Sequence, residues 1–231
     1  MNLTILLSLI VATAVVYGLS RALFNWIQLR GLKHETAREL LSTIGQKALA
    51  RLPDEIALVR EDAPQWHDPA GVEQQVAPLL REGFIGLGAY RVDKMPGVLV
   101  HMLFQPETYV EAHIYDHPKS GSWTEFVTRY TDGSSHTLST LPPTGMNRPA
   151  WIRKIQADKS VPTDQLYRQF KTQREWHGIK PITAQDVIPE FEDGFRRLMA
   201  WRYQQGISPQ EVAHVARKWV IKEKAKSAAQ I

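Results

Sequence analysis

The sequence predicts an α+β protein with a transmembrane helix at its N-terminus, followed by a soluble domain in which a five-stranded antiparallel meander is flanked by helices. Three observations lead to this fold class. An apolar run opens the 231-residue chain, the middle has the short alternating segments of β-strands, and the last third returns to helical spacing. We expect an anchor and interfacial segment over 1–30, a juxtamembrane helix and loop over 31–69, and one α+β domain over 70–231.

The first element is an uncharged run from Leu3 to Leu19. About 17 helical residues span roughly 26 Å, which is close to the apolar thickness of a bilayer. A cleaved signal peptide is the competing interpretation, because Ala12-Thr13-Ala14 would serve as a cleavage site. No Lys or Arg precedes the run, and the run continues past that site, so the sequence favours an uncleaved helix that lies in membrane lipid.

Basic residues follow this anchor but do not precede it; the first are Arg21, Arg30, Lys33 and Arg38. Lys and Arg near a helix end resist translocation. We therefore expect a single-pass protein with its N-terminus outside and its domain in the cytoplasm. The chain has no cysteine, so disulfides give no information about the compartment.

Two helices are expected before the strands. Apolar residues at helical spacing predict a helix over 31–52, which Pro53 ends. The segment 60–69 has two prolines and clustered polar residues, which predicts a loop. A second helix is expected over 70–81, because Gly83 can adopt the positive φ that closes many helices.

Five short strands are expected between residues 84 and 141, separated by turn-forming segments. Short links between consecutive strands predict an antiparallel meander. The dipeptide Asp132-Gly133 predicts a two-residue hairpin turn, in which Tyr130 faces Ser135.

The strand over 98–104 is apolar on both sides, which predicts a central position in the sheet. His101 within it is expected to be a neutral, hydrogen-bonded core residue rather than a ligand. Gly83, Gly86 and Gly88 precede no helix and no P-loop lysine, so we expect them to ease strand curvature or close backbone approach rather than to bind a nucleotide.

A strand register that brings apolar side chains together gives one apolar sheet face, comprising Val110, Ala112, Ile114, Trp123, Val127 and Leu138. The opposite face is then polar, aromatic and rich in hydroxyl groups. Amphipathic aromatics provide area and hydrogen bonding together, so this face supplies the candidate residues for binding a partner or ligand: Tyr109, Glu111, His113, Tyr115, Phe126 and Tyr130. An equally good interpretation is that helices cover this face and its aromatics are core.

Glu111 and His113 are the candidate pair for a chemical role, because the alternation of side chains along a strand places both on one side, about 7 Å apart. Metal binding or acid–base catalysis would need further converging groups. The chain has no HExxH motif, no nucleophile elbow and no cysteine. We therefore predict no catalytic residue, no metal site and no cofactor, and an enzymatic role is the less favoured alternative.

Three helical stretches are expected after the strands. Thr163 can cap the first, and the second covers 188–205. The third begins at Ser208-Pro209, where Glu211 completes a capping box. Its far end is basic, which indicates a solvated tail or, alternatively, contact with anionic lipid through Arg217, Lys218, Lys222, Lys224 and Lys226.

The sequence thus favours a membrane-anchored, non-enzymatic interaction or scaffold protein that presents its α+β domain to a protein partner. The alternative is a small-ligand or lipid-handling domain, with a cavity between meander and helices that uses Glu111 and His113. A net charge of +4 without aromatics among the basic residues argues against nucleic acid as a partner. The oligomeric state is left open.

Overall fold

A computed structural model of the protein describes residues 34–217. The predicted anchor over 3–19 and the basic residues Lys218, Lys222, Lys224 and Lys226 lie outside the described residues. Within 34–217, none of the helices combines the length and the apolar character that crossing a bilayer requires. The described chain divides into a sheet unit, residues 55–142 and 149–197, and a helical unit, residues 34–54, 143–148 and 198–217.

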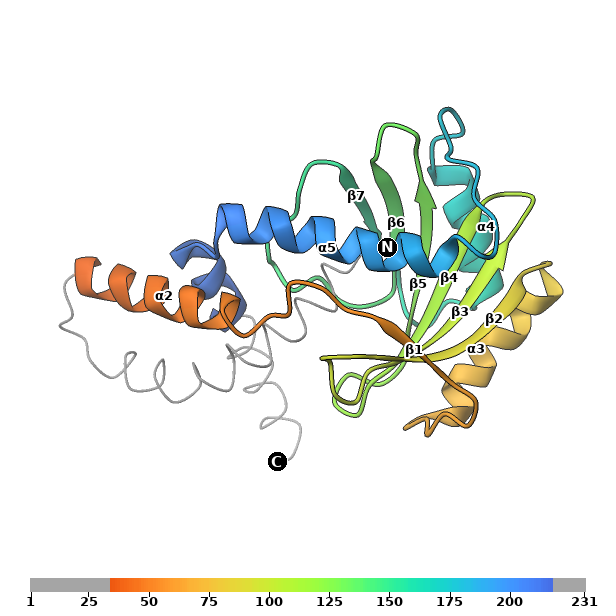
Figure 1. Ribbon diagram of the computed structural model, residues 1–231, viewed down its shortest axis with the longest axis horizontal. Helices are drawn as coiled ribbons and strands as arrows, with labels where there is room; N and C mark the ends of the chain where they lie inside the picture. Colours follow the sequence, from red (N-terminus) through yellow and green to blue (C-terminus); the bar gives the residue numbers. More distant parts are fainter. Residues whose placement is uncertain (1–33, 218–231) are drawn as a thin grey trace. The chain divides into compact units, whose positions relative to one another are not determined.

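The sheet unit contains a seven-stranded sheet whose strands lie in sequence order (Figure 1). Neighbouring strands are antiparallel except the last two, which are parallel. The strands are β1 (Leu58–Glu61), β2 (Ile85–Val92), β3 (Leu99–Gln105), β4 (Val110–Asp116), β5 (Trp123–Arg129), β6 (Ser135–Ser139) and β7 (Ile152–Gln156).

The expected five-strand meander is confirmed as β2 to β6, but the sequence prediction missed both edge strands. β1 is four residues long and begins just before the segment interpreted as a loop. β7 carries Arg153 and Lys154 between its apolar residues. Edge strands pair on one side only and are often short and charged, so neither gives a clear apolar alternation. The fold is therefore α+β with a mixed sheet.

Helices cover both faces of this sheet. α3 (Pro69–Arg81) and α4 (Thr163–Gln173) pack against β4 and β5 on one face, and the first part of α5 (Val187–Gln205) crosses the other (Figure 1). The predicted helices over 70–81 and 188–205 are thus confirmed to within one residue. α3 begins where the Asp68 carboxylate accepts a hydrogen bond from the Gly71 N–H over 2.9 Å. Gly83 has a φ of +82°, as expected after a helix end.

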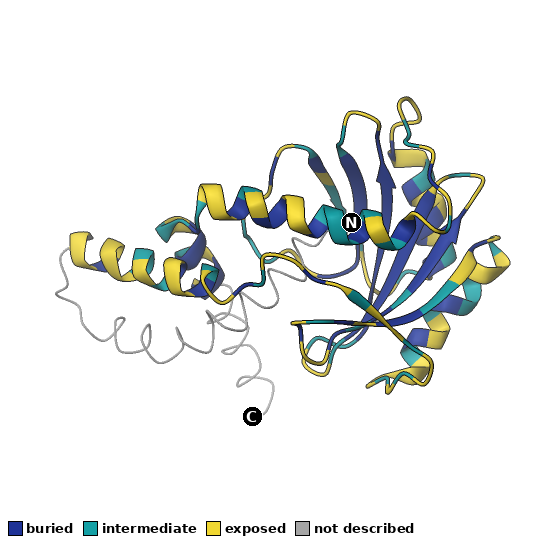
Figure 2. Cartoon of the chain, in the orientation of Figure 1, coloured by how far each residue is buried: buried dark blue, intermediate teal, exposed yellow. Residues whose placement is uncertain are grey.

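The main apolar core lies between the sheet and the pair α3 and α4. In Figure 2 the central strands are buried along almost their whole length. Burial of this apolar surface is the main contribution to the stability of the unit. The core consists of Val72, Val76, Leu79, Phe84, Leu103, Val110, Ala112, Ile114, Phe126, Leu138, Leu166, Tyr167 and Phe170.

The predicted register between β4 and β5 is wrong by one residue. Ala112 pairs with Phe126, and Glu111 pairs with Val127. Phe126 therefore lies in the apolar core, while Val127 lies on the polar side with Glu111. A register chosen by grouping apolar residues is dependable only where one face is open to water, and here helices cover both.

The hairpin turn between β5 and β6 is also one residue longer than predicted. The Tyr130 N–H donates to the Ser134 carbonyl, and the Gly133 N–H donates to the Tyr130 carbonyl, both over 3.0 Å. Gly133 has a φ of +81°. This is a three-residue loop from Thr131 to Gly133 whose last residue forms a bulge, so Tyr130 pairs with Ser134 instead of Ser135.

The helical unit contains α2 (His34–Leu49), the end of α5 and a helix over 209–217. The predicted capping box is confirmed, because the Glu211 N–H donates to Ser208 Oγ over 3.2 Å and the Ser208 N–H donates to Glu211 Oε2 over 3.0 Å. Arg202 forms a buried ion pair of 2.8 Å with the same Glu211. Close backbone approach requires Gly45 on α2, because a Cβ there would lie 2.5 Å from the Ile207 carbonyl oxygen.

Candidate functional site

Glu111 and His113 lie side by side on β4, on the face of the sheet that α5 crosses, which we call the α5 face. A hydrogen bond of 3.1 Å joins His113 Nε2 to Glu111 Oε2. Arg129 from β5 donates to both carboxylate oxygens of Glu111, with its Nη2 3.1 Å from Oε2. All three side chains are buried. The predicted pair is therefore part of a closed ion pair with a histidine attached.

Burial and neighbouring charge set the ionisation of this cluster. Burial by itself raises the pKa of Glu111, but the Arg129 guanidinium and the hydrogen bond from His113 outweigh it and hold the pKa well below its usual range. Burial lowers the pKa of His113 to about 4, against the opposing effect of Glu111. At neutral pH the carboxylate is charged and the imidazole is neutral, so the His113 Nε2–H donates to Glu111.

A second carboxylate, Glu125, lies opposite His113 on β5. Its Oε1 is 3.9 Å from Lys154 Nζ on β7, and both side chains are buried. Burial raises the pKa of Glu125 to about 7, although Lys154 opposes this, so the carboxyl titrates near neutral pH. Burial also raises the pKa of the neighbouring Tyr115, whose ring stacks on Trp123 with centroids 4.7 Å apart.

Several polar atoms of the α5 face find no hydrogen-bond partner in the part of the chain that the structure describes. Such atoms are few in folded proteins, because each costs about 1–3 kcal/mol. Phe191 of α5 packs edge-on against His113, with ring centroids 5.3 Å apart, and helps to close the face. The unpartnered atoms include His113 Nδ1, Trp123 Nε1, Glu125 Oε1 and Thr137 Oγ1.

The six predicted contact residues do not form one open surface. Glu111, His113 and Tyr115 are buried on the α5 face. Phe126 is buried on the opposite face, in the apolar core, because of the register described above. A partner cannot touch these four side chains in this conformation, which agrees with the alternative interpretation that helices cover these residues and not with an open contact surface.

The remaining two predicted residues lie at turns. Tyr130 is buried, and its hydroxyl donates to the Glu175 carbonyl over 3.0 Å. Tyr109 is 36% exposed and has a φ of 53°, an uncommon conformation for a residue with a side chain. Arg217, the described member of the predicted lipid-contact group, is exposed.

An open groove lies elsewhere in the sheet unit, between the first turns of α3 and strands β1 to β3. We call it the α3 groove. Its volume is about 470 Å³, within the range of roughly 300–1,000 Å³ that is typical of ligand sites. It is lined by Arg60, Glu61, Asp62, Pro64, Trp66, Pro69, Val72, Glu73, Val76, Gly88, Ala89 and His101.

Local backbone features open this groove. The pairing of β2 with β3 shifts between Gly86 and Gly88, which forms a bulge. Gly86 has no side chain to fill the space beside His101 and Leu80. A Cβ atom on Gly86 would lie 3.8 Å from His101 Nε2 and 4.0 Å from Leu80 Cδ2. Leu80 itself is 48% exposed. A large apolar side chain therefore remains accessible beside the groove.

Aromatic and charged side chains form the walls. The rings of Trp66 and His101 lie 6.4 Å apart. Burial lowers the pKa of His101, and the charge of Glu73 opposes this only in part. Arg60 donates to the Leu87 carbonyl over 3.3 Å.

Sequence reasoning did not find this site. It treated 60–69 as a connecting loop and His101 as an ordinary core residue. A tryptophan between two prolines, and two glycines in a strand that follows a helix, were the available signals. Neither signal shows that the segment 60–69 lies beside β2 and β3. Its position follows from the pairing of β1 with β2, which a local pattern does not reveal.

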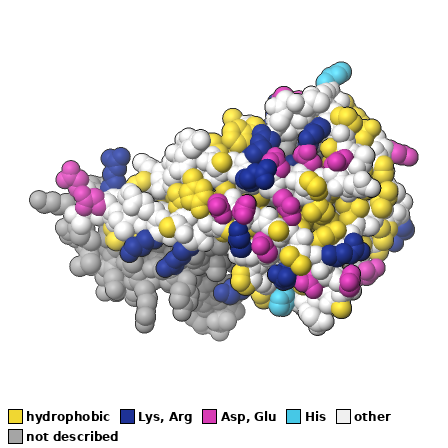
Figure 3. Space-filling model, in the orientation of Figure 1, with side chains coloured by type: hydrophobic (Ala, Val, Ile, Leu, Met, Phe, Trp, Pro, Cys, Tyr) yellow, Lys and Arg dark blue, Asp and Glu magenta, His cyan; other side chains and the backbone are white. Residues whose placement is uncertain are grey.

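The described residues contain no group of three His, Asp or Glu side chains placed to hold a metal ion. Lys, Arg, Asp and Glu side chains are interspersed on the face of the molecule in Figure 3, without a large area of one sign. In comparisons with known proteins, no family model, no curated protein and no solved structure matches the chain.

Proposed function

We propose that this chain is a single-pass, membrane-anchored interaction protein without enzymatic activity, and that a segment of a protein partner binds in the α3 groove. The proposed anchor is the apolar run from Leu3 to Leu19, which leaves the domain on the cytoplasmic side. One observation carries the binding proposal: the groove is an open space of about 470 Å³ with the exposed apolar side chain of Leu80 at its edge.

Binding is favoured over catalysis because the residues suited to acid–base chemistry are closed in. Glu111, His113 and Glu125 are all buried beneath α5. The groove has its own ionisable pair, His101 and Glu73, but no hydrogen bond joins them. A general base needs a positioned partner within hydrogen-bond reach. The residues of the groove therefore suit binding of a partner better than acid–base catalysis.

A further pocket of about 410 Å³ lies between α3 and α4, but polar groups that line it are already hydrogen-bonded to other groups of the protein. The Thr124 hydroxyl donates to Gln75 Oε1 over 2.6 Å, and the Thr163 hydroxyl donates to the Gln75 carbonyl over 2.8 Å. Groups already bonded to one another gain little from a ligand. The α3 groove, with the accessible side chain of Leu80 at its edge, is the better binding site.

A second candidate function is the binding of a small polar ligand on the α5 face. The unpartnered atoms of His113, Trp123, Glu125 and Thr137 favour it, because a ligand with matching donors and acceptors would satisfy them. This function requires the α5 face to open. It is therefore ranked below the α3 groove.

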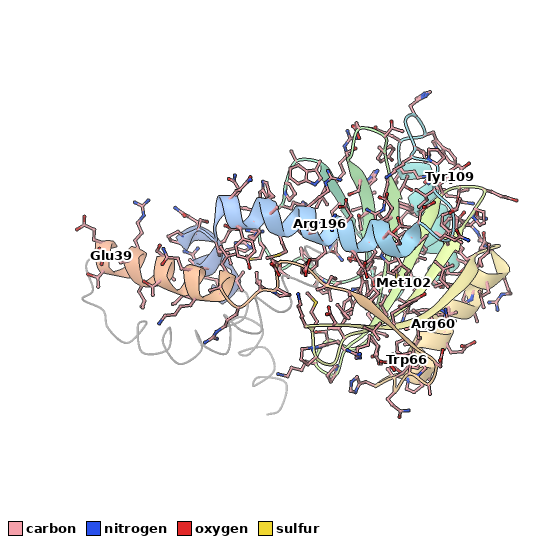
Figure 4. All side chains as sticks on the ribbon, in the orientation of Figure 1. Glu39, Arg60, Trp66, Met102, Tyr109 and Arg196 are labelled. Carbon is pink, nitrogen blue, oxygen red and sulfur yellow. The ribbon has the colours of Figure 1, made fainter. Side chains whose placement is uncertain are left out.

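Photo-crosslinking in native membranes tests the proposed function. A benzophenone amino acid replaces Leu80, beside the groove, in one full-length variant and Tyr109 in another. Both positions are exposed, and Figure 4 places Tyr109 well away from Arg60 and Trp66 of the groove. We expect one reproducible protein adduct from position 80 and none from 109. No adduct at 80, or the same adducts at both positions, would rule out partner binding in the groove.

A further inference from the structure

The charges around the α3 groove are unequal. Three carboxylates and one guanidinium line it. Two of the carboxylates are paired: Glu61 with Arg91 at 3.0 Å and Asp62 with Arg60 at 3.4 Å. Glu73 on α3 is exposed, and no ion pair to it is present among residues 34–217. The groove therefore carries one uncompensated negative charge.

The aromatic wall adds to this preference for a cation. The Trp66 indole lines the groove beside His101, and the face of an indole attracts Lys and Arg side chains. Burial keeps the pKa of His101 below its ordinary value, so the imidazole does not offset the charge of Glu73 at neutral pH. Glu73 and Trp66 both line the groove and both attract a cation.

The floor of the groove is apolar. Val72 and Val76 of α3 and Ala89 of β2 contribute side chains, and Gly88 contributes none. These floor side chains are almost wholly buried, so the accessible apolar surface comes from Leu80, which is 48% exposed and lies near Gly86. A ligand that is only a cation would leave this surface wet, and a purely aliphatic ligand would leave Glu73 without a partner.

We propose that the α3 groove recognises a partner segment in which a Lys or Arg adjoins an aliphatic residue. The cation lies against Glu73 and Trp66, and the aliphatic side chain packs on the exposed Leu80 at the edge of the groove. The inference rests on the proposed function and deepens it by naming the chemistry of the partner. Its negative charge distinguishes the groove from a site for anionic lipid headgroups, which Glu73 would repel.

Selection from a randomised heptapeptide display library, against the full-length protein in detergent micelles, tests this chemistry. Peptides that bind wild type are re-measured on Glu73→Gln, on Trp66→Phe and on a control, Glu107→Gln, which removes an exposed carboxylate outside the groove. We expect selected peptides to contain Lys or Arg next to Leu, Ile or Val. Their affinity should fall about tenfold or more on Glu73→Gln, several-fold on Trp66→Phe and not on Glu107→Gln.

The outcomes separate the two proposals. Peptides that lose affinity on Trp66→Phe but lack a basic residue, or ignore Glu73→Gln, would overturn the basic–aliphatic inference and leave groove binding intact. A selection in which no peptide responds to either groove variant would overturn both. Unchanged melting temperatures of the three variants exclude misfolding as the cause of a loss.

Discussion

On the α5 face of the sheet, Glu111, His113 and Glu125 are buried under a helix, whereas at the α3 groove Glu73 is exposed and His101 is half-buried. Both regions contain a carboxylate and a histidine. The difference lies in coverage: α5 packs Phe191 onto His113, while a bulge and two glycines keep the groove open. The residue types alone therefore do not locate a binding site. Access to solvent decides which of the two carboxylate–histidine groups can contact a partner.

Removing one partner of the buried ion pair should produce the largest effect. Arg129→Met leaves the charge of Glu111 buried without compensation, so we expect the free energy of unfolding to fall by about 3–5 kcal/mol. Urea unfolding of the full chain in micelles, followed by tryptophan fluorescence, measures it. Arg153→Met is the control, because Arg153 pairs with Glu175 at an exposed site and its loss should cost at most about 1 kcal/mol. Equal losses would show that the α5 face is not closed.

The next largest effect is the pH dependence of stability that is due to Glu125. Its pKa is raised from 4.5 to about 7 in the folded state. Between these values the folded protein holds more protons than the unfolded chain, so the stability due to Glu125 falls as pH rises. Glu125→Gln lacks this loss, and its stability relative to wild type should increase by up to about 3 kcal/mol from pH 4.5 to pH 7.

His113 has the opposite dependence, since its pKa is lowered from 6.5 to about 4 and its contribution is lost as pH falls through that range. Because His113 is present in both proteins, its contribution cancels in the difference between wild type and Glu125→Gln. Melting temperatures at several pH values provide the measurement. A difference that stays constant with pH would mean that water reaches Glu125 and that the face is open.

A smaller change in stability, on substitution of Thr137, shows whether the polar groups of the α5 face are free or bind a small molecule. Among residues 34–217, no hydrogen-bond partner of the buried Thr137 Oγ1 is present, so Thr137→Val should raise the free energy of unfolding by about 1 kcal/mol. Thr124→Val, whose hydroxyl donates to Gln75, should lower it by a similar amount. If Thr137→Val also destabilises the protein as purified, a bound molecule satisfies the hydroxyl. Small-ligand binding on the α5 face would then displace the groove as the leading function.

The sequence was sufficient where local chemistry determines structure. The capping box of Ser208 and Glu211, the helix that ends before Gly83 and the five central strands all follow from nearby residues. The sequence was insufficient where coverage by distant elements matters. Phe126 and Val127 are both apolar enough for either face, and only the helices on both sides explain why each is buried.

The candidate site shows the same limit more strongly. Glu111 and His113 were correctly placed on one side of a strand, but their closure depends on α5, about 80 residues further along the chain. The α3 groove depends on β1 pairing with β2. Local patterns cannot show which surfaces remain uncovered, since that is a property of the whole chain.

The smallest expected effect is on the stability of groove variants. Glu73→Gln and Leu80→Ser change exposed side chains, so each should alter the free energy of unfolding by no more than about 0.5 kcal/mol. Val76→Ala, on the same helix but buried in the core, should cost about 1–3 kcal/mol. Urea unfolding of the three variants checks the contrast. A large loss on changing Glu73 or Leu80 would mean that these side chains support the fold, whereas near-neutral effects leave partner binding as the property that they serve.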